Sequence, residues 1–328
     1  MQAIEAQPFP DTGTWLKARR GSLGASDVPS LYGLGYQSEL ALWVDKRSEL
    51  AKSPDSELPE QEFNLRFAVG HAVEPVLAQV AQADLGHPVV RLDPPVMYRR
   101  RDLPGAAGTR FHCTPDALVL ESLPQKIHRQ TLHKRALGLS SFKSAAFDSE
   151  DWPEDAPHPY ALLQIEAEML LTGLREGWVT ALFGLGKSRT MPAQFHESFA
   201  SDLVERVERF WEHVQKDVPP APRGTESDAR AIRLLFPRSS PTRVFLGSEW
   251  GSKVSRLAAL DEQISTLETE KEQIRQEAQL ALGEAQLGII PGYPKALKWA
   301  TQIENHQPRP ARTIEKRVFR IVNPPKEE

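Results

Sequence analysis

The chain has 328 residues, enough for one large domain or two smaller ones. Its 40% hydrophobic and 26% charged content is typical of a globular protein, and no apolar run reaches the ~18 residues that a membrane span needs. A single cysteine, Cys113, excludes an internal disulfide and a cysteine-cluster zinc site. Because residues 1–10 show neither the basic nor the apolar region of a signal peptide, we expect a cytoplasmic protein.

The net charge of −4 comes from 40 basic and 44 acidic residues and does not by itself indicate nucleic-acid binding. Residues 85–143 differ from the rest, because ten Lys and Arg residues there face only four Asp and Glu residues. This local surplus of +6 is compatible with a contact surface for phosphates, and also with a solvated loop.

Apolar spacing predicts a mixture of helices and strands over the first two thirds of the chain. We expect a short helix and a Gly/Ser-rich turn over residues 15–35, and further helices over 39–46, 63–85, 160–174 and 197–217. The expected strands lie at 89–98, in two pieces within 109–121, at 138–145 and at 177–185. Residues 218–229 are rich in proline and polar side chains, which is typical of a linker.

The C-terminal third has a different pattern. Residues 254–282 carry a 3–4 apolar spacing with Lys271 as the one polar position on the seam, which predicts a coiled coil or a helical hairpin. We expect this helix to pack on itself or on the main domain. Shorter pieces follow at 293–302, around Trp299, and at 314–321.

Three residues form a chemically meaningful set. Glu74 lies in a predicted helix, Asp116 begins a predicted strand, and Lys143 ends the next one. Two carboxylates are hard oxygen ligands for Mg²⁺, and a lysine beside them can position a water or stabilise developing charge. Two carboxylates and a lysine are the residue types with which a metal-dependent phosphodiesterase binds its metal and stabilises the reacting phosphate. Each of the three residues, taken alone, is as well explained by a turn or a solvated surface position.

Several segments in the same order resemble the lambda-exonuclease-type, YqaJ-like viral recombinase nucleases of the PD-(D/E)XK superfamily. The resemblance reaches to about Pro222 and is carried by four segments: RRGSLGASDVPSLYGLGYQSELALWVDK, FAVGHAVEPVLAQVA, HCTPDALV and PYALLQIEAEMLLTG. Trp299 and the RVFRI segment resemble the tail of phage-type members. The resemblance implies an α/β, restriction-endonuclease-like core at residues 1–222, a mixed sheet flanked by helices, followed by a helical, coiled-coil-like extension at 223–328.

The same resemblance implies roles for individual residues. Glu74 and Asp116 match the metal ligands of the family, Lys143 its catalytic lysine, and Gln164 a helix glutamine that borders the active site. The positions that grip the 5′-phosphate of the degraded strand correspond to Arg19, Ser26 and Thr114. Such a pocket is physically reasonable, since arginine and hydroxyl groups bind phosphate well.

One departure from the family pattern affects the metal site. The family has Glu-x-Lys on its second core strand, whereas this chain has Ser141-Phe142-Lys143. In some restriction enzymes of the superfamily a Ser-x-Lys strand recruits a glutamate from the next helix. Here that helix offers Glu166 and Glu168, and Glu168 lies one turn after Gln164, on the same helix face. Alternatively, the chain is a catalytically dead relative that still binds DNA, or Ser141 is an introduced inactivating change.

A second departure is the long stretch between the two core strands, residues 121–138. It contains Lys126, His128, Arg129, His133, Lys134 and Arg135. These side chains could contact backbone phosphates, or form a surface insertion without a role.

The resemblance implies a Mg²⁺- or Mn²⁺-dependent deoxyribonuclease, with 5′→3′ digestion of linear double-stranded DNA in phage-type recombination as the expected activity. A nuclease-dead DNA-end-binding protein and a nonspecific endonuclease are the alternatives. The expected partners are DNA ends, a single-strand annealing protein and further copies of the chain, without a membrane.

Overall fold

The computed structural model describes residues 3–50, 65–145, 152–153, 156–184 and 186–301. The chain divides into two compact units, Met1–Leu235 and Phe236–Glu328. Within the described ranges, no helix is both long and apolar enough to cross a membrane.

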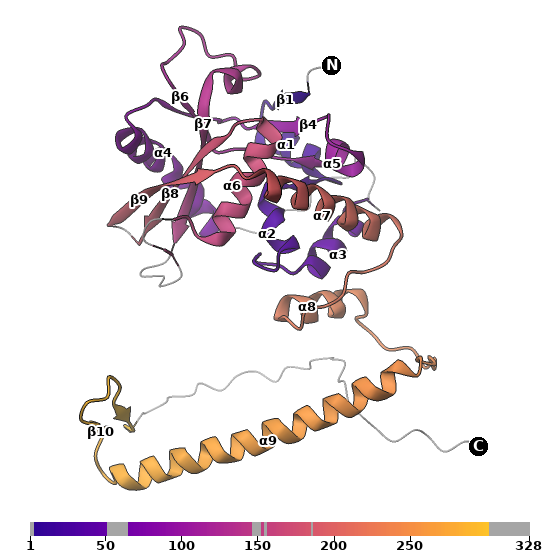
Figure 1. The fold of residues 1–328 in the computed structure, drawn as a ribbon, viewed down its shortest axis with the longest axis vertical. Coiled ribbons are helices and arrows are strands. Elements are labelled where there is room, and N and C mark those ends of the chain that lie inside the picture. The colour runs from indigo at the N-terminus through magenta and orange to yellow at the C-terminus, as the bar shows by residue number, and fades with distance from the viewer. Residues whose placement is uncertain (1–2, 51–64, 146–151, 154–155, 185, 302–328) are drawn as a thin grey trace, which may run out of the picture. The chain divides into compact units, whose positions relative to one another are not determined.

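The first unit is built on a five-stranded sheet in the order β3-β6-β7-β8-β9 (Figure 1). Its strands are β3 (Val89–Arg91), β6 (Ala117–Leu120), β7 (Ala136–Ala145), β8 (Glu176–Phe183) and β9 (Lys187–Gln194). Strands β7 and β8 pair in parallel, and the other neighbours are antiparallel. The expectation of a mixed sheet flanked by helices is therefore confirmed.

Helices cover both faces of this sheet. Side chains alternate between the faces of a strand, so Phe142 points to the opposite face from its neighbour Ser141. Helix α4 (Leu65–Leu85) packs on the Phe142 face, where Leu77 contributes to a small apolar cluster. Helix α6 (Pro159–Thr172) packs on the other face, where Ile165 belongs to the main core. In Figure 1, α4 and α6 lie on either side of β7 and β8.

The N-terminal segments form two further small sheets. Strand β1 (Ile4–Pro8) pairs antiparallel with β4 (Val96–Arg100), and β2 (Leu23–Gly24) pairs parallel with β5 (Phe111–His112). Four helices complete this part: α1 (Thr12–Arg19), α2 (Val28–Leu31), α3 (Glu39–Leu50) and α5 (Gly105–Arg110). Two short 3-10 helices span Ala25–Asp27 and Leu132–Arg135. The β2–β5 pair places the end of α1 beside the strand that leads to Asp116.

Helix α6 ends where the sequence predicts it. Gly173 caps the helix with φ 74° and ψ 6°, a left-handed conformation that favours glycine. Helix α7 (Glu197–Gln215) follows β9 and buries one apolar face, including Phe210 and Trp211. Both helices lie within a residue or two of their predicted ranges. Strand β9 is not predicted from the sequence, because it is a polar edge strand without an apolar run.

The segment predicted as a linker is folded. Helix α8 (Glu226–Leu235) begins with a reciprocal cap between Thr225 and Asp228. Asp228 Oδ2 accepts from Thr225 N at 3.0 Å, Thr225 Oγ1 at 2.9 Å and Arg223 N at 2.9 Å, and Asp228 N donates to Thr225 Oγ1 at 3.1 Å. This capping box supplies hydrogen-bond acceptors to backbone N–H groups that have no partner within the first turn of a helix. Ala231, in the same helix, is buried.

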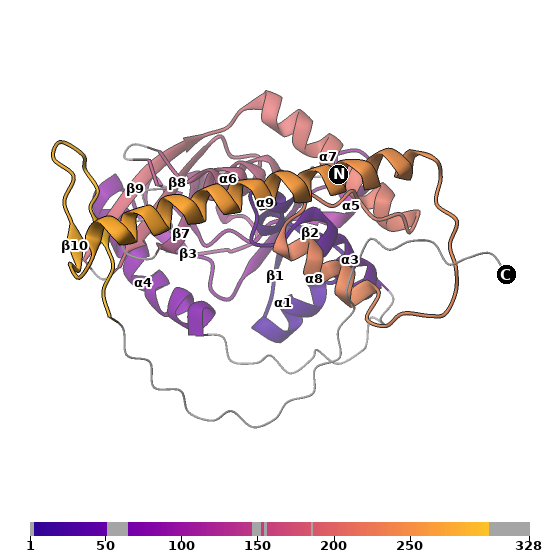
Figure 2. The same cartoon turned by 90° about the horizontal axis from the view of Figure 1, so that it is seen from below.

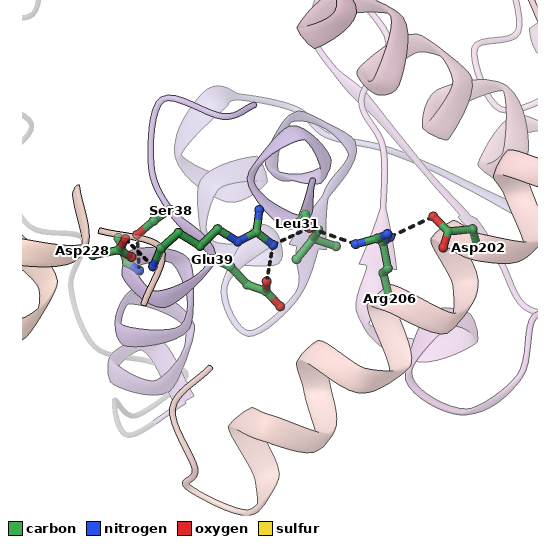
Figure 3. Close-up of polar contacts among 8 residues, drawn as sticks. Leu31, Ser38, Glu39, Asp202, Arg206 and Asp228 are labelled. Atoms are coloured by element: carbon green, nitrogen blue, oxygen red, sulfur yellow. Dashed lines mark hydrogen bonds and ion pairs between the residues drawn. The ribbon is translucent and has the colours of Figure 1, made fainter. Parts of the chain in front are cut away.

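Hydrogen bonds to the Leu31 carbonyl connect both α7 and the segment before α8 to α2 (Figure 3). The Leu31 carbonyl at the end of α2 accepts from Arg206 of α7 and from Arg223, both at 3.3 Å. Arg206 also pairs with Asp202 at 2.8 Å, and Arg223 with Glu39 at 3.1 Å. The first unit therefore continues to Leu235, past the expected domain boundary at residue 222.

The described part of the second unit consists of one long helix and a small hairpin. Helix α9 (Glu249–Leu282) is continuous over 34 residues, as Figure 2 shows. Strands β10 (Leu287–Gly288) and β11 (Leu297–Lys298) pair antiparallel after it. The predicted piece at 314–321 lies outside the described residues.

Candidate active site and anion pocket

Asp116, Ser141 and Lys143 meet on one face of the sheet, at the inner strands β6 and β7. The β6–β7 register pairs Ala117 with Ser140, so Asp116 lies opposite Ser141. Asp116 Oδ2 accepts from the Phe142 backbone N at 2.7 Å and from Ser141 Oγ at 3.3 Å. Lys143 Nζ donates to Ser141 Oγ at 2.9 Å. Because positions 141 and 143 share a strand face, the ammonium and the Asp116 carboxylate lie on the face that α6 covers.

Glu168 of α6 is buried beside this group, with 2% exposure. Gln164 Nε2 donates to Glu168 Oε1 at 2.8 Å, which places both side chains on one helix face as their spacing predicts. The other oxygen, Oε2, is buried and has no hydrogen-bond partner. Burial and the charge of Asp116 raise the pKa of Glu168 to about 7, against the opposing effects of Lys143 and Gln164. Glu168 is thus a carboxylate held close to Asp116 and Lys143.

The Glu166 carboxylate contacts His196 and not the group around Asp116. Its Oε2 accepts from His196 N at 3.3 Å and lies 3.1 Å from His196 Nδ1, at the start of α7. Of the two glutamates that the sequence offers on α6, only Glu168 therefore contributes to the group around Asp116.

Glu74 does not join this group. It lies on α4, which covers the opposite face of the sheet, and its carboxylate bonds Arg91 Nη2 at 3.0 Å and His71 Nδ1 at 2.8 Å. Within the described ranges, no three His, Cys, Asp or Glu side chains come close enough to hold a metal ion together. Asp116 and Glu168 are a pair of candidate oxygen ligands. The orphaned Glu168 oxygen fits a cation, because an unpaired buried carboxylate oxygen is costly without a positive partner.

A second group of polar atoms surrounds Gly24, at the junction of α1, β2 and β5. A Cβ on Gly24 would lie 3.4 Å from Ser26 Oγ, 3.5 Å from Arg19 Nη2 and 3.5 Å from His112 Nε2. The absence of a side chain at residue 24 thus leaves a small cradle between three groups suited to an anion. Thr114 borders it indirectly: Trp15 Nε1 donates to Thr114 Oγ1 at 3.1 Å, and the Arg19 guanidinium lies 4.6 Å from the centre of the Trp15 ring.

His112 is a member of this cradle that sequence reasoning missed. Its Nδ1 lies 2.7 Å from Ser22 Oγ, which also donates to Arg19 O at 3.2 Å, so the ring is tied to the end of α1. The sequence offers one signal for it, because His112 lies two residues before Thr114 and four residues before Asp116.

The surroundings of His112 are positively charged. Burial, followed by the charges of Arg19, Arg99 and Lys46, holds the pKa of His112 well below its usual range. Lys46 is itself 7% exposed and pairs with Asp27 at 3.6 Å. The cradle therefore has an excess of cations beneath it, which favours a bound anion.

The basic stretch is less available than its composition suggests. Arg91 pairs with Glu74, Arg101 with Glu5 at 2.5 Å, and Arg129 donates to the carbonyls of Asp93 and Pro94. His133 is buried against Tyr98. Four basic side chains of the 121–138 loop are exposed: Lys126, His128, Lys134 and Arg135.

Comparison with known proteins places this fold in a family. Residues 14–175 match the family model of the YqaJ-like viral recombinase domain. Among solved structures, an alkaline exonuclease from Laribacter hongkongensis has 17% identity and a TM-score of 0.44, over 63% of this chain and 94% of that one. A phage-related exonuclease from Haemophilus somnus has 11% identity and a TM-score of 0.38, over 60% and 94%. No curated protein is significantly similar in sequence. Through the domain at residues 14–175, the chain belongs to the YqaJ-like viral recombinase family.

Proposed function

We propose that the first unit is a metal-dependent nuclease with a restriction-endonuclease-like core, and that it hydrolyses phosphodiester bonds of DNA. One observation carries the proposal: the buried, unpartnered Oε2 of Glu168 beside Asp116 and Lys143. A carboxylate pair and a lysine on one face of a sheet are suited to phosphodiester chemistry. The similar solved structures are exonucleases by name, which agrees with this assignment.

Asp116 and Glu168 would hold Mg²⁺ or Mn²⁺, with Glu168 in place of the strand glutamate that Ser141 replaces. When bound, such a cation polarises a phosphoryl oxygen and lowers the pKa of a bound water. Glu74, also expected as a ligand, is held by Arg91 on the other face of the sheet. For Glu74 to reach the ion, that ion pair would have to open.

The remaining side chains act around the reacting phosphate. Lys143 places its ammonium next to Ser141 Oγ, where it can orient a water and stabilise the charge that develops on phosphoryl oxygens. Gln164 fixes the Glu168 carboxylate in one orientation through its 2.8 Å bond and can contact the substrate strand with its remaining amide atoms.

The cradle around Gly24 would take the 5′-phosphate of the digested strand. Arg19 supplies a charge-assisted contact, Ser26 a hydroxyl and His112 a ring nitrogen. Where Ser22 Oγ donates to His112 Nδ1 instead of to Arg19 O, the neutral ring carries its proton on Nε2 and donates it to the phosphate. Thr114 and Asp116 are two residues apart in the chain, so their Cα atoms lie within roughly 7 Å of each other. A phosphate bound at the cradle therefore leaves the next linkage near Asp116, which supports 5′→3′ digestion that starts at an end.

We further propose that this activity serves phage-type recombination, acting on linear double-stranded DNA ends and supplying a single strand to an annealing protein. One observation favours a second candidate, a nuclease-dead protein that binds DNA ends. Ser141 brings no charge to the site, and no group of three or more candidate metal ligands occurs among the described residues.

The test incubates the full-length protein with linear, 5′-phosphorylated duplex DNA in Mg²⁺ or Mn²⁺, beside covalently closed circles. Lys143→Ala is the inactivating variant, and Lys216→Ala, an exposed lysine paired with Glu212 in α7, is the matched control. We expect degradation of linear DNA by the wild type and by Lys216→Ala, and none by Lys143→Ala.

Cut circles would identify an endonuclease instead. Intact linear DNA with retained end binding would replace the nuclease assignment with the end-binding one. Equal degradation by Lys143→Ala and wild type would contradict the assigned site.

A further inference from the structure

Helix α9 presents an apolar stripe that the other described residues of the second unit leave exposed. Leu257, Leu260, Ile264, Leu267 and Ile274 are each between 36% and 62% exposed. Soluble monomers rarely leave a contiguous stripe of large apolar side chains in water. The stripe lies within the second unit and does not depend on the chemistry of the first.

The stripe follows a heptad repeat. Counting Leu257 as position a, the a positions are Leu257, Ile264, Lys271 and Ala278, and the d positions are Leu260, Leu267, Ile274 and Ala281. A strict repeat of 3.5 residues keeps one seam facing a partner helix over many turns, whereas packing on a globular surface requires no such regularity. We propose that α9 pairs with α9 of a second copy of this chain, in parallel and in register, as a two-stranded coiled coil.

The charges beside the seam determine the direction. In a parallel pair each g position faces the e position five residues later on the other helix. Arg256 then faces Asp261 of the second copy, and Glu270 faces Arg275 of the second copy. By two-fold symmetry each contact occurs twice, and all four are attractive.

An antiparallel pair is less favourable. With α9 fully overlapped, e positions face e positions and g positions face g positions, so two repulsive Asp261–Glu268 contacts offset two attractive Arg256–Glu277 contacts. Lys271 would then oppose Leu260 in the seam. In the parallel pair, Lys271 faces Lys271 of the second copy, and a Glu270 carboxylate beside each ammonium offsets their repulsion.

The composition of the seam also fits two strands. A single polar residue at an a position fixes the register and limits the number of helices, at a cost in stability. Lys271 is that residue, and Ala278 and Ala281 narrow the seam toward the end of α9. At about 1.5 Å per residue the 34 residues of α9 span roughly 51 Å, which accommodates the four heptads.

The test uses disulfide trapping in the full-length protein. The native thiol, Cys113, is buried and does not compete. In Leu260→Cys, a parallel in-register pair brings the two new thiols together at a d position. In the overlapped antiparallel pair, residue 260 faces residue 271, so the two thiols would be roughly 17 Å apart, too far for a disulfide. Glu262→Cys, on the outer face at position f, is the matched control.

We expect covalent dimers of Leu260→Cys under mild oxidation and none of Glu262→Cys. In the chain without the new cysteine, Arg256→Glu and Asp261→Arg should each weaken association about tenfold by sedimentation, because attraction becomes repulsion, and the double variant should restore it. Absence of the Leu260→Cys crosslink, a monomeric sedimentation mass, or failure of the double variant to recover would overturn the proposal. If the stripe instead packed against the first unit of the same chain, sedimentation would give the mass of a monomer.

Discussion

Asp116, the residue before β6, lies opposite Ser141 of β7, with Ser141 Oγ 3.3 Å from Asp116 Oδ2. This is the position from which a strand carboxylate would reach a metal shared with Asp116. The serine instead bridges Asp116 and Lys143 through its hydroxyl. Glu168 approaches the same place from α6, so the carboxylate lost from the sheet is matched by one on the helix that covers it.

Glu168→Gln is expected to abolish cleavage, by a factor of about 100 or more, since it removes one of two charged ligands. The protein should stay folded, because a neutral amide suits a buried site at which the carboxylate pKa is already raised to about 7. Cleavage rates and circular dichroism are the measurements. Glu166→Gln is the control, since Glu166 bonds His196 instead, and activity in Glu168→Gln equal to that of Glu166→Gln would refute the ligand role.

Moving the acid back to the strand provides a complementary experiment. In the Glu168→Gln background, Ser141→Glu should restore measurable cleavage, because residue 141 faces Asp116 across the sheet. Ser144→Glu, on an exposed position of the same strand, should restore nothing. A folded double variant as inactive as Glu168→Gln would show that the two positions are not interchangeable.

Gly24→Ala is expected to remove the preference for 5′-phosphorylated ends, with roughly a tenfold loss per lost charged contact. Residue 24 has φ −91° and ψ 155°, which alanine adopts readily. Its new methyl group would occupy the cradle without a clash. Rates on 5′-phosphate and 5′-hydroxyl ends are compared, with Gly70→Ala, which points into open space, as the control.

On 5′-hydroxyl ends Gly24→Ala and wild type should be equal, and Arg19→Ala should behave in the same way. An equal loss on both kinds of end would instead point to general damage of the fold.

His112 predicts an acid-dependent loss of stability. Its pKa is lowered in the folded protein, so between that low value and about 6.5 the unfolded chain binds more protons. The free energy of unfolding should therefore fall as the pH drops below 6.5. His112→Asn should show a flatter profile in urea titrations, and profiles parallel to the wild type would exclude His112 as the cause.

Asp228→Ala should destabilise the first unit by roughly 1–3 kcal/mol, because three donors lose their acceptor at the start of α8. Urea unfolding is the measurement. Glu226→Ala, an exposed acid in the first turn of α8, is the control. Equal stability of the two variants would mean that α8 contributes little to the unit.

Local features of the fold could be predicted from sequence, and features set by packing could not. The end of α6 at Gly173 and the apolar face of α7 follow from local sequence patterns, and the structure has both. Helix α8 was missed because it depends on Asp228 and on contacts with distant carbonyls such as that of Leu31. An edge strand such as β9 carries no apolar signal, since one side of it faces water.

The candidate site divides in the same way. The one-turn spacing of Gln164 and Glu168 suffices to place both on one face of α6, and their hydrogen bond bears this geometry out. The position of Glu74 depends on which face of the sheet α4 covers, a tertiary property that periodicity does not specify. The position of His112, four residues before Asp116, was a signal in the sequence that was not used.

The location of Glu168 on a helix has a mechanical consequence. A strand carboxylate would join two neighbouring strands that the sheet already fastens together. An ion held between Asp116 and Glu168 would instead act as a brace between the sheet and α6. Chelation would then loosen the packing of that helix on the sheet as well as stop the chemistry. Removing the ion would therefore lower both the cleavage activity and the rigidity of the core.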